Sequence, residues 1–236
     1  MPSGTLYLFP VTLGETEISL VIPVFNVELI QTIGLFIAED AKNARRFLKQ
    51  CSYPDISKAE ILLLNEHTKD SELPSLVNEL MQGKNVGLLS DAGCPGIADP
   101  GAEVVRLAHQ KNIKVVPLVG PSSIVLSIMA SGFNGQNFAF NGYLPIEKPA
   151  RIKKIRELEQ LVYKSNQAQY FIETPYRNTS LFDDLLLNLN PDTALCLGIN
   201  LTTVSEKVMT KSVAGWKKTT KPDLNKVPAV FGIYKI

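Results

Sequence analysis

The residues best suited to chemistry stand in the segment SDAGCPGIADPG, residues 90–101, which follows a predicted strand and precedes a predicted helix. In open parallel sheets, ligands bind just beyond the carboxyl ends of the strands. Three glycines and two prolines impose an irregular backbone that a ligand can approach closely. At the strand's end, the Asp91 carboxylate can accept hydrogen bonds from a ribose hydroxyl or an amine. A plain structural turn, with Asp91 and Asp99 acting only as caps, explains the same residue types.

A second segment of this kind is VGPSS, residues 119–123, which also follows a predicted strand and opens a predicted helix. Backbone N–H groups at a helix start, together with two hydroxyls, make a polar pocket floor. A simple N-cap by Ser122 is the alternative. We expect the two segments to end neighbouring strands and so to line one cleft.

Several other chemistries lack their residues. The sequence contains no Gly-x-x-x-x-Gly-Lys-[Ser/Thr] phosphate loop, no Gly-x-Gly-x-x-Gly after the first strand and no Gly-x-Ser-x-Gly elbow. His67 and His109 are too few for a metal cluster, so we expect no metal. The three cysteines are odd in number and widely spaced, which argues against a disulfide framework and suits a reducing cytoplasm.

Short apolar runs alternate with amphipathic segments through the first half, which predicts a parallel α/β sheet covered on both faces. Strands are predicted at 5–11, 35–40, 60–65, 85–91 and 113–119, with helices at 44–50, 71–84 and 99–112. Ser71 is the expected N-cap of the second helix. Asp99 is the expected N-cap of the third, with Pro100 at its first position.

The second half predicts a mixed α/β arrangement. Strands are expected at 138–144, 168–174, 193–200, 205–213 and 227–236, with helices at 150–164 and 179–189. The stretch 207–213 alternates polar and apolar residues, as a half-exposed antiparallel strand does. We therefore predict an α/β fold with a parallel domain at 1–119 and a mixed domain at 120–236.

Charge and hydropathy narrow the choice of compartment and partner. Residues 115–146 carry no charge, but Pro117 and Gly120 interrupt them, so we predict a strand, a turn and a helix instead of a membrane span. The N-terminus shows no basic region followed by an apolar run, so we expect no signal peptide and a cytoplasmic location. Residues 120–236 hold 14 Lys and Arg against 9 Asp and Glu, which permits an anionic partner such as RNA. Solvated surface lysines explain that excess equally well.

Taken together, the two segments and FAFNGYLP (138–145) resemble the tetrapyrrole (corrin/porphyrin) methylase superfamily. Within it, the likeness is greatest to the ribosomal small-subunit RNA 2′-O-methyltransferase I branch. Supporting stretches are FIAEDAKNARRFL, LLLNEHTKDSELP with its Glu66-His67 pair, FIETPYRNTSLFDDL and KVPAVFGIYKI. The resemblance therefore covers nearly the whole chain. It implies a two-domain class III (tetrapyrrole methylase-like) methyltransferase that holds S-adenosylmethionine between its halves and forms a homodimer.

Carried over residue by residue, the resemblance implies three sets of positions. The donor S-adenosylmethionine would contact the two loops and backbone from both halves: Pro10, Asp91, Ala92, Gly93, Ile97, Ala98, Ser122, Ser123, Phe171 or Ile172, Pro228 and Ala229. The substrate side would include Glu39, Arg45, Glu173 and Arg177. Methylation of a ribose hydroxyl also needs removal of its proton, and the candidate bases are Asp40, Glu66 and His67. A solvated loop residue is the alternative for each base.

Departures from the RNA branch cluster on the substrate side. Ala41-Lys42 stands where that branch has Thr-Arg, and residues 198–203 lack an Arg and a Glu of its Ala-Arg-Glu-Leu-Thr-Lys segment. Three functions therefore stay open. The chain is an RNA 2′-O-methyltransferase acting on the small ribosomal subunit, a methyltransferase of a tetrapyrrole-like small molecule, or a donor-binding paralogue without catalysis.

Overall fold

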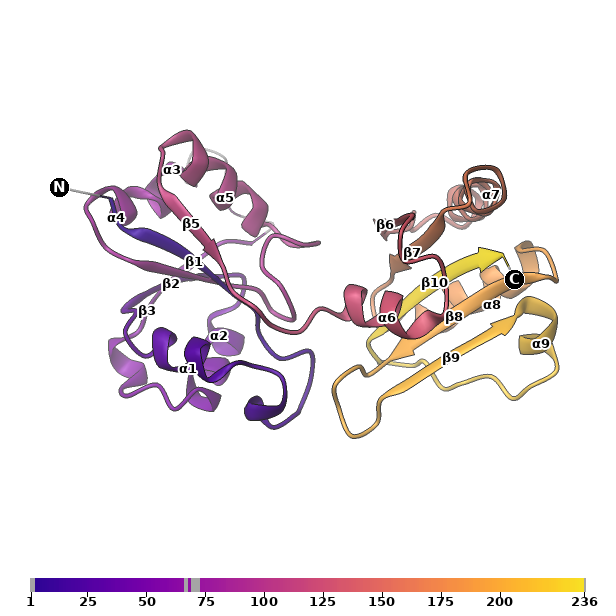
Figure 1. The fold of residues 1–236 in the computed structure, drawn as a ribbon, viewed down its shortest axis with the longest axis horizontal. Coiled ribbons are helices and arrows are strands. Elements are labelled where there is room, and N and C mark those ends of the chain that lie inside the picture. The colour runs from indigo at the N-terminus through magenta and orange to yellow at the C-terminus, as the bar shows by residue number, and fades with distance from the viewer. Residues whose placement is uncertain (1–2, 66–67, 69–72, 236) are drawn as a thin grey trace. The chain divides into compact units, whose positions relative to one another are not determined.

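The structure is a computed structural model that describes residues 3–65, 68 and 73–235. The chain divides into two compact units, Met1–Ser122 and Ser123–Ile236 (Figure 1). The division lies three residues beyond the boundary expected from the sequence. No helix in the described part of the chain is long and apolar enough to cross a membrane.

Unit 1 is a five-stranded parallel sheet, as predicted. The strands are β1 (Thr5–Phe9), β2 (Leu35–Ala38), β3 (Glu60–Leu63), β4 (Val86–Leu89) and β5 (Lys114–Pro117), in the order β3-β2-β4-β1-β5. Because β1 lies between β4 and β5, the two loops do not end neighbouring strands, and that expectation was wrong. They follow strands on either side of β1.

Helices cover both faces of this sheet (Figure 1). α1 (Val24–Ile30) and α2 (Ala41–Gln50) contribute Ile30 and Phe47 to one core cluster. α3 (Leu73–Leu76), α4 (Asn78–Met81) and α5 (Gly101–Gln110) contribute to the other cluster. The single helix predicted over 71–84 is therefore two short helices, and its expected cap Ser71 lies outside the described residues. Short 3₁₀ helices occur at Ile18–Leu20 and Ile56–Lys58.

Unit 2 is built on a mixed five-stranded sheet in the order β6-β7-β10-β8-β9. Its strands are β6 (Phe138–Tyr143), β7 (Ala168–Ile172), β8 (Thr193–Ile199), β9 (Lys207–Ser212) and β10 (Ala229–Lys235). Only the β6–β7 pair is parallel among these neighbours. β9 is a half-exposed antiparallel edge strand, which confirms its alternating pattern.

Four helices pack against this sheet: α6 (Ser123–Ser131), α7 (Lys148–Ser165), α8 (Asn178–Asn188) and α9 (Val213–Lys217). Ile128 of α6 packs with Tyr170 and Val230 in a small cluster. The large cluster joins α7, α8 and α9, with Trp216 fully buried and donating from Nε1 to the Leu195 carbonyl at 2.8 Å. These two clusters fix the sheet whose strand ends carry the site residues of unit 2.

Candidate functional site

The carboxyl ends of β1, β2 and β4 gather the site residues of unit 1. The chain after β1 pairs with the loop after β4, since the Val11 N–H donates to the Gly93 carbonyl at 2.9 Å and the Gly93 N–H donates back at 3.3 Å. The Ser90 hydroxyl donates to the same Gly93 carbonyl at 2.9 Å. The loop is thereby held against the sheet, as expected for a ligand-binding loop.

The loop backbone depends on its glycines. Gly93 has φ +79° and is buried, and a Cβ there would stand 3.2 Å from Leu13 Cδ2. The side chain of Asp99 fixes the far end, because its Oδ1 accepts from the N–H groups of Gly96 (2.7 Å) and Gly101 (2.8 Å). The expectation that Asp99 is the N-cap and Pro100 the first helical residue was wrong by one position, because Pro100 is the N-cap of α5; the Asp99 carboxylate still accepts from the first helical N–H, that of Gly101.

The predicted donor-binding residues of this loop differ in exposure. Asp91, Ala92, Ile97 and Ala98 are exposed, with 49% of the Ile97 surface accessible, whereas Gly93 is buried. Ala98 adopts φ +59°, a left-handed conformation that costs a residue with a Cβ free energy. Exposed side chains on a strained, firmly anchored backbone are the arrangement that a binding loop needs.

The second loop, after β5, packs against the first. Cys94 Sγ lies 3.5 Å from the Pro121 carbonyl, and the Asn26 side chain donates to the Val119 carbonyl at 2.8 Å. Only glycine fits at position 120, because the backbone there lies so close to Pro10 that a Cβ would stand 2.4 Å from Pro10 Cβ. Pro10 itself is buried. The structure therefore brings Pro10 and both loops to one edge of the sheet.

The two serines of this loop stand at the division of the chain. Ser122 ends unit 1, Ser123 is the first residue of α6 in unit 2, and both are half-buried.

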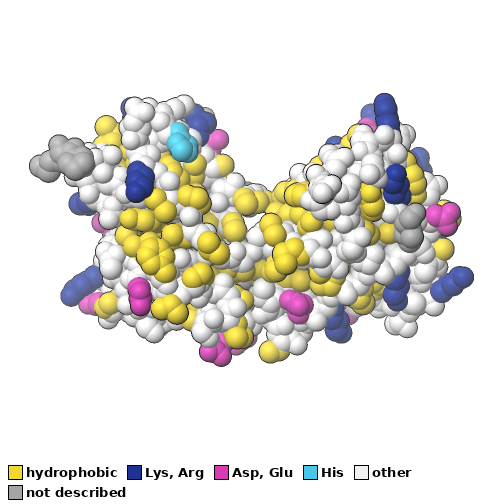
Figure 2. Space-filling view, viewed as in Figure 1, with side chains coloured by type: hydrophobic (Ala, Val, Ile, Leu, Met, Phe, Trp, Pro, Cys, Tyr) yellow, Lys and Arg dark blue, Asp and Glu magenta, His cyan; other side chains and the backbone are white. Residues whose placement is uncertain are grey.

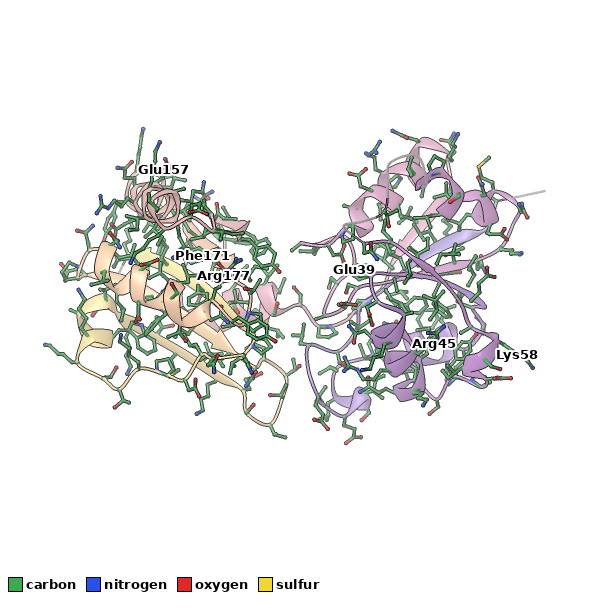
Figure 3. All side chains as sticks on the ribbon, turned by 180° about the vertical axis from the view of Figure 1, so that it is seen from behind. Glu39, Arg45, Lys58, Glu157, Phe171 and Arg177 are labelled. Atoms are coloured by element: carbon green, nitrogen blue, oxygen red, sulfur yellow. The ribbon has the colours of Figure 1, made fainter. Side chains whose placement is uncertain are left out.

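Three carboxyl groups make the rim of unit 1 acidic. Burial, together with the nearby charges of Asp99 and Asp91, raises the pKa of Glu39 to about 7, against a hydrogen bond from the Asp91 backbone that lowers it. Burial likewise raises the pKa of Asp99. Figure 3 shows Glu39 just beyond the end of β2. A cation bound here would relieve the repulsion among these groups.

The raised pKa of Glu39 predicts a pH-dependent stability. A carboxyl whose pKa is higher in the folded state than in the unfolded state stabilises the fold below the unfolded pKa, and this contribution is lost as the pH rises through 7. Glu39→Gln keeps the neutral form, so its melting temperature should exceed the parent's by a margin that grows between about pH 4.5 and pH 7 and then stays constant. Thermal denaturation by circular dichroism measures this. Glu60→Gln, at the opposite end of the sheet, is the control, and a pH-independent difference for Glu39→Gln would contradict the prediction.

The other N-terminal candidates divide into described and undescribed residues. Asp40 is the N-cap of α2, and its Oδ1 accepts from the Asn43 N–H at 2.7 Å, so part of its carboxylate serves the helix. Arg45 is exposed on α2 (Figure 3). Glu66 and His67 lie outside the described residues. Within the part of the chain that the structure describes, no group of three potential metal ligands occurs.

Unit 2 gathers its own predicted site residues. Ile172 pairs with Val230 in the register of β7 and β10, which places Glu173 beside the start of β10. Arg177, at the N-cap of α8, forms an ion pair with Glu173 at 2.6 Å. Phe171 is fully buried and stacks on Phe231, so any ligand contact from Phe171 would come from its backbone. Figure 3 shows Phe171 and Arg177 in this unit.

Several buried polar atoms in this group lack partners. Glu173 Oε2, Arg177 Nε and Asn178 Oδ1 are buried and have no hydrogen bond within the described residues. The Asn178 amide donates to the Val227 carbonyl at 2.6 Å, and so ties α8 to the segment that contains Pro228 and Ala229. Buried polar groups are nearly always paired with protein or with ordered water, so these three atoms are sites where a water or a polar group of a ligand would bind.

Sequence reasoning missed Asp99 as part of the acidic rim, because it was expected only to cap a helix. It also missed Asn178. A polar residue directly after Arg177, at the start of a predicted helix, is the signal that points to it. Both residues take part through contacts between distant segments, which residue types alone do not specify.

Three comparisons bear on the class of protein. No family model matches the chain. The crystal structure of the methyltransferase CobJ matches all of this chain and 95% of that one, with a TM-score of 0.66 and 13% identity. The chain therefore has the two-domain α/β fold of the tetrapyrrole methylases.

Curated relatives show which methyltransferases the chain resembles in sequence. The chain is similar to the ribosomal RNA small subunit methyltransferase I of Halalkalibacterium halodurans (30% identity, covering 82% of this chain and 63% of that one). It also matches the proteins of that name from Vibrio cholerae (29%; 88% and 69%) and Escherichia coli O157:H7 (27%; 94% and 74%). By sequence the chain is similar to the ribosomal RNA small subunit methyltransferases I over most of its own length, and its fold is that of the methyltransferase CobJ. The matches span 63% to 74% of these relatives' own lengths.

Proposed function

We propose that the protein is an S-adenosylmethionine-dependent methyltransferase that methylates RNA of the small ribosomal subunit at a ribose 2′-oxygen. The observation that carries the first part is the acidic rim of unit 1, where Glu39, Asp91 and Asp99 stand beside a glycine-dependent backbone. The names of the curated relatives support the second part.

The residues present fit such a donor, which carries a sulfonium, an ammonium and a ribose. The exposed Asp91 carboxylate accepts no hydrogen bond from the described residues, so it is free to accept from ribose hydroxyls or the ammonium. Ile97 offers an exposed apolar surface to the adenine. The remaining donor contacts are proposed for backbone and hydroxyl groups, at Pro10, Ala92, Gly93, Ala98, Ser122, Ser123, Ile172, Pro228 and Ala229.

The chain's own contribution is binding and orientation. When bound, the donor supplies an electrophilic methyl group. Holding the acceptor oxygen in line with that carbon contributes roughly 7–11 kcal/mol in favourable cases. Glu173, Arg177 and Asn178 offer unpaired buried donors and acceptors to the acceptor strand. Asp40, Glu66 and His67 stay the candidates for receiving the hydroxyl proton.

Two measurements test the proposal. Calorimetry with S-adenosylmethionine and S-adenosylhomocysteine should give one site, and no binding would reject a donor-dependent function. Labelled methyl groups should then pass to small ribosomal subunits purified from a methylation-deficient host, with the label recovered in a 2′-O-methylated nucleotide. Donor binding without transfer to RNA would instead favour a small-molecule methyltransferase or a donor-binding paralogue, and transfer to a tetrapyrrole would separate those two.

The homodimer and the cytoplasmic location implied at the sequence level are part of the same proposal. A dimer is expected by light scattering at working concentration. A monomer would contradict that part while leaving the donor-binding assignment intact.

A further inference from the structure

One of two basic stretches of unit 2 lies near its C-terminus. Residues 207–226 contain six Lys and one Asp, a net charge of +5, which equals the whole positive excess of residues 120–236. The segment comprises β9, α9 and the loop leading toward β10. Figure 2 shows Lys and Arg side chains over the part of unit 2 where Figure 1 places β9 and α9. The segment therefore provides a basic surface.

The other basic stretch of unit 2, on α7, is a weaker candidate for binding an anion. Arg151 is only 6% exposed, and its guanidinium donates from Nε and Nη2 to Asp184 Oδ2 at 2.8 and 2.7 Å. Lys148 lies 3.5 Å from the other oxygen of that carboxylate. In the basic helix expected from the sequence at 150–164, part of the positive charge is therefore neutralised by Asp184, in a contact that holds α7 to α8.

A cavity of about 300 Å³ is lined mainly by the basic segment, with further contributions from the end of β8, the loop after it and Val227. Lys207, Met209 and Lys211 alternate along β9, so their side chains share one face of the sheet, and all three line the cavity. Trp216 and Pro222 add apolar surface to the wall. This volume is at the small end of ligand pockets and suits a single nucleotide.

The lining combines charge with apolar surface. Lys207 and Lys211 take part in none of the ion pairs that join described residues, and Lys211 Nζ lies 4.9 Å from the centre of the Trp216 ring. Asp223 also lines the cavity, but its Oδ1 accepts from the Asn225 N–H at 3.0 Å within its own loop. Two ammonium groups that form no ion pair with the described residues, beside an apolar wall, suit a phosphate attached to a flat ring.

We infer that this cavity is an RNA-binding subsite that takes one nucleotide of a single-stranded segment, with its phosphate on Lys207 and Lys211 and its base or ribose against Met209 and Pro222. The inference rests on the proposed RNA-directed function and deepens it. According to this inference, β9 and the following loop bind the substrate RNA, whereas the loops of unit 1 bind the methyl donor.

The test uses the full-length chain and a short single-stranded RNA of mixed sequence with a terminal fluorophore. The variant K207Q/K211Q removes two cavity lysines, and K217Q/K218Q removes two exposed lysines of the same segment that do not line the cavity. Fluorescence anisotropy should show about tenfold weaker RNA binding for the first pair. For K207Q/K211Q, the slope of the logarithm of the binding constant against the logarithm of the salt concentration should be shallower by about 0.7 for each phosphate that the variant no longer neutralises. The control pair should weaken binding less than about threefold.

A third variant, Thr220→Phe, places a larger side chain at the exposed rim of the cavity without removing charge. It should weaken RNA binding about fivefold if a nucleotide enters. Equal effects of the two lysine pairs, unchanged binding by T220F, or equally good competition by polyglutamate would overturn the inference. Calorimetry with S-adenosylmethionine on the same proteins keeps the two proposals apart, because intact donor binding with unchanged RNA binding rejects the subsite alone.

Discussion

Asp91→Ala should lower the affinity for S-adenosylmethionine by about hundredfold or more without lowering the melting temperature. Asp91 is exposed at the end of β4, and its carboxylate receives no hydrogen bond from the described residues, so the fold does not depend on it. A bound donor would offer it hydroxyl or ammonium hydrogens. A bound donor would cover this hydrogen bond, and losing one partner of a covered, charged hydrogen bond costs about 2–5 kcal/mol, which corresponds to this loss of affinity.

Isothermal calorimetry at neutral pH measures the effect, with Glu60→Ala as a matched control. That substitution removes the same charge from an exposed position at the opposite end of the sheet, the amino end of β3. Its affinity should stay within about twofold of the parent's, because long-range effects of surface charge are small and screened. Normal donor binding by D91A would show that the site has been assigned to the wrong loop.

The sheets were predictable because their strands are short apolar runs whose periodicity differs from that of helices. All five strands of unit 1 fall inside predicted ranges, and the alternation in β9 identified a half-exposed strand. α1 was missed because VFNVELI sits in a long apolar stretch without a helical pattern of its own. α9 was missed because a five-residue helix containing Gly215 carries almost no periodic signal.

The candidate site was predictable where one local motif carries it, and unpredictable where distant segments meet. Gly93 was singled out by its motif, and its positive φ and close contacts supply the reason. Glu173 and Arg177, which form an ion pair, are only four residues apart in the sequence, so this contact is also local. By contrast, the pKa of Glu39, which follows β2, depends on the charges of Asp91 and Asp99, which follow β4. Asn178 likewise donates a hydrogen bond to Val227, which is 49 residues away in the sequence. Such contacts need the register of the sheet, which residue types do not provide.

Asp184→Ala should destabilise the protein by about 3–5 kcal/mol, the largest stability effect that we expect from one substitution. Asp184 is 2% exposed and neutralises Arg151, which is itself 6% exposed. Removing the carboxylate leaves a buried guanidinium without its counter-charge, and an uncompensated buried charge costs about this much. Urea denaturation followed by circular dichroism measures the change in the free energy of unfolding.

Asp183 is a matched control one residue away. Its ion pair with Lys221 is exposed, with 42% and 58% of the two side chains accessible, so Asp183→Ala should cost less than about 1 kcal/mol. The double variant R151M/D184L should regain most of the stability, because apolar residues of similar size commonly replace a buried pair without cost. If D184A and D183A were equally mild, the pair would not hold α7 to α8. The position of Asn178 and Arg177 at the start of α8 would then need another source of rigidity.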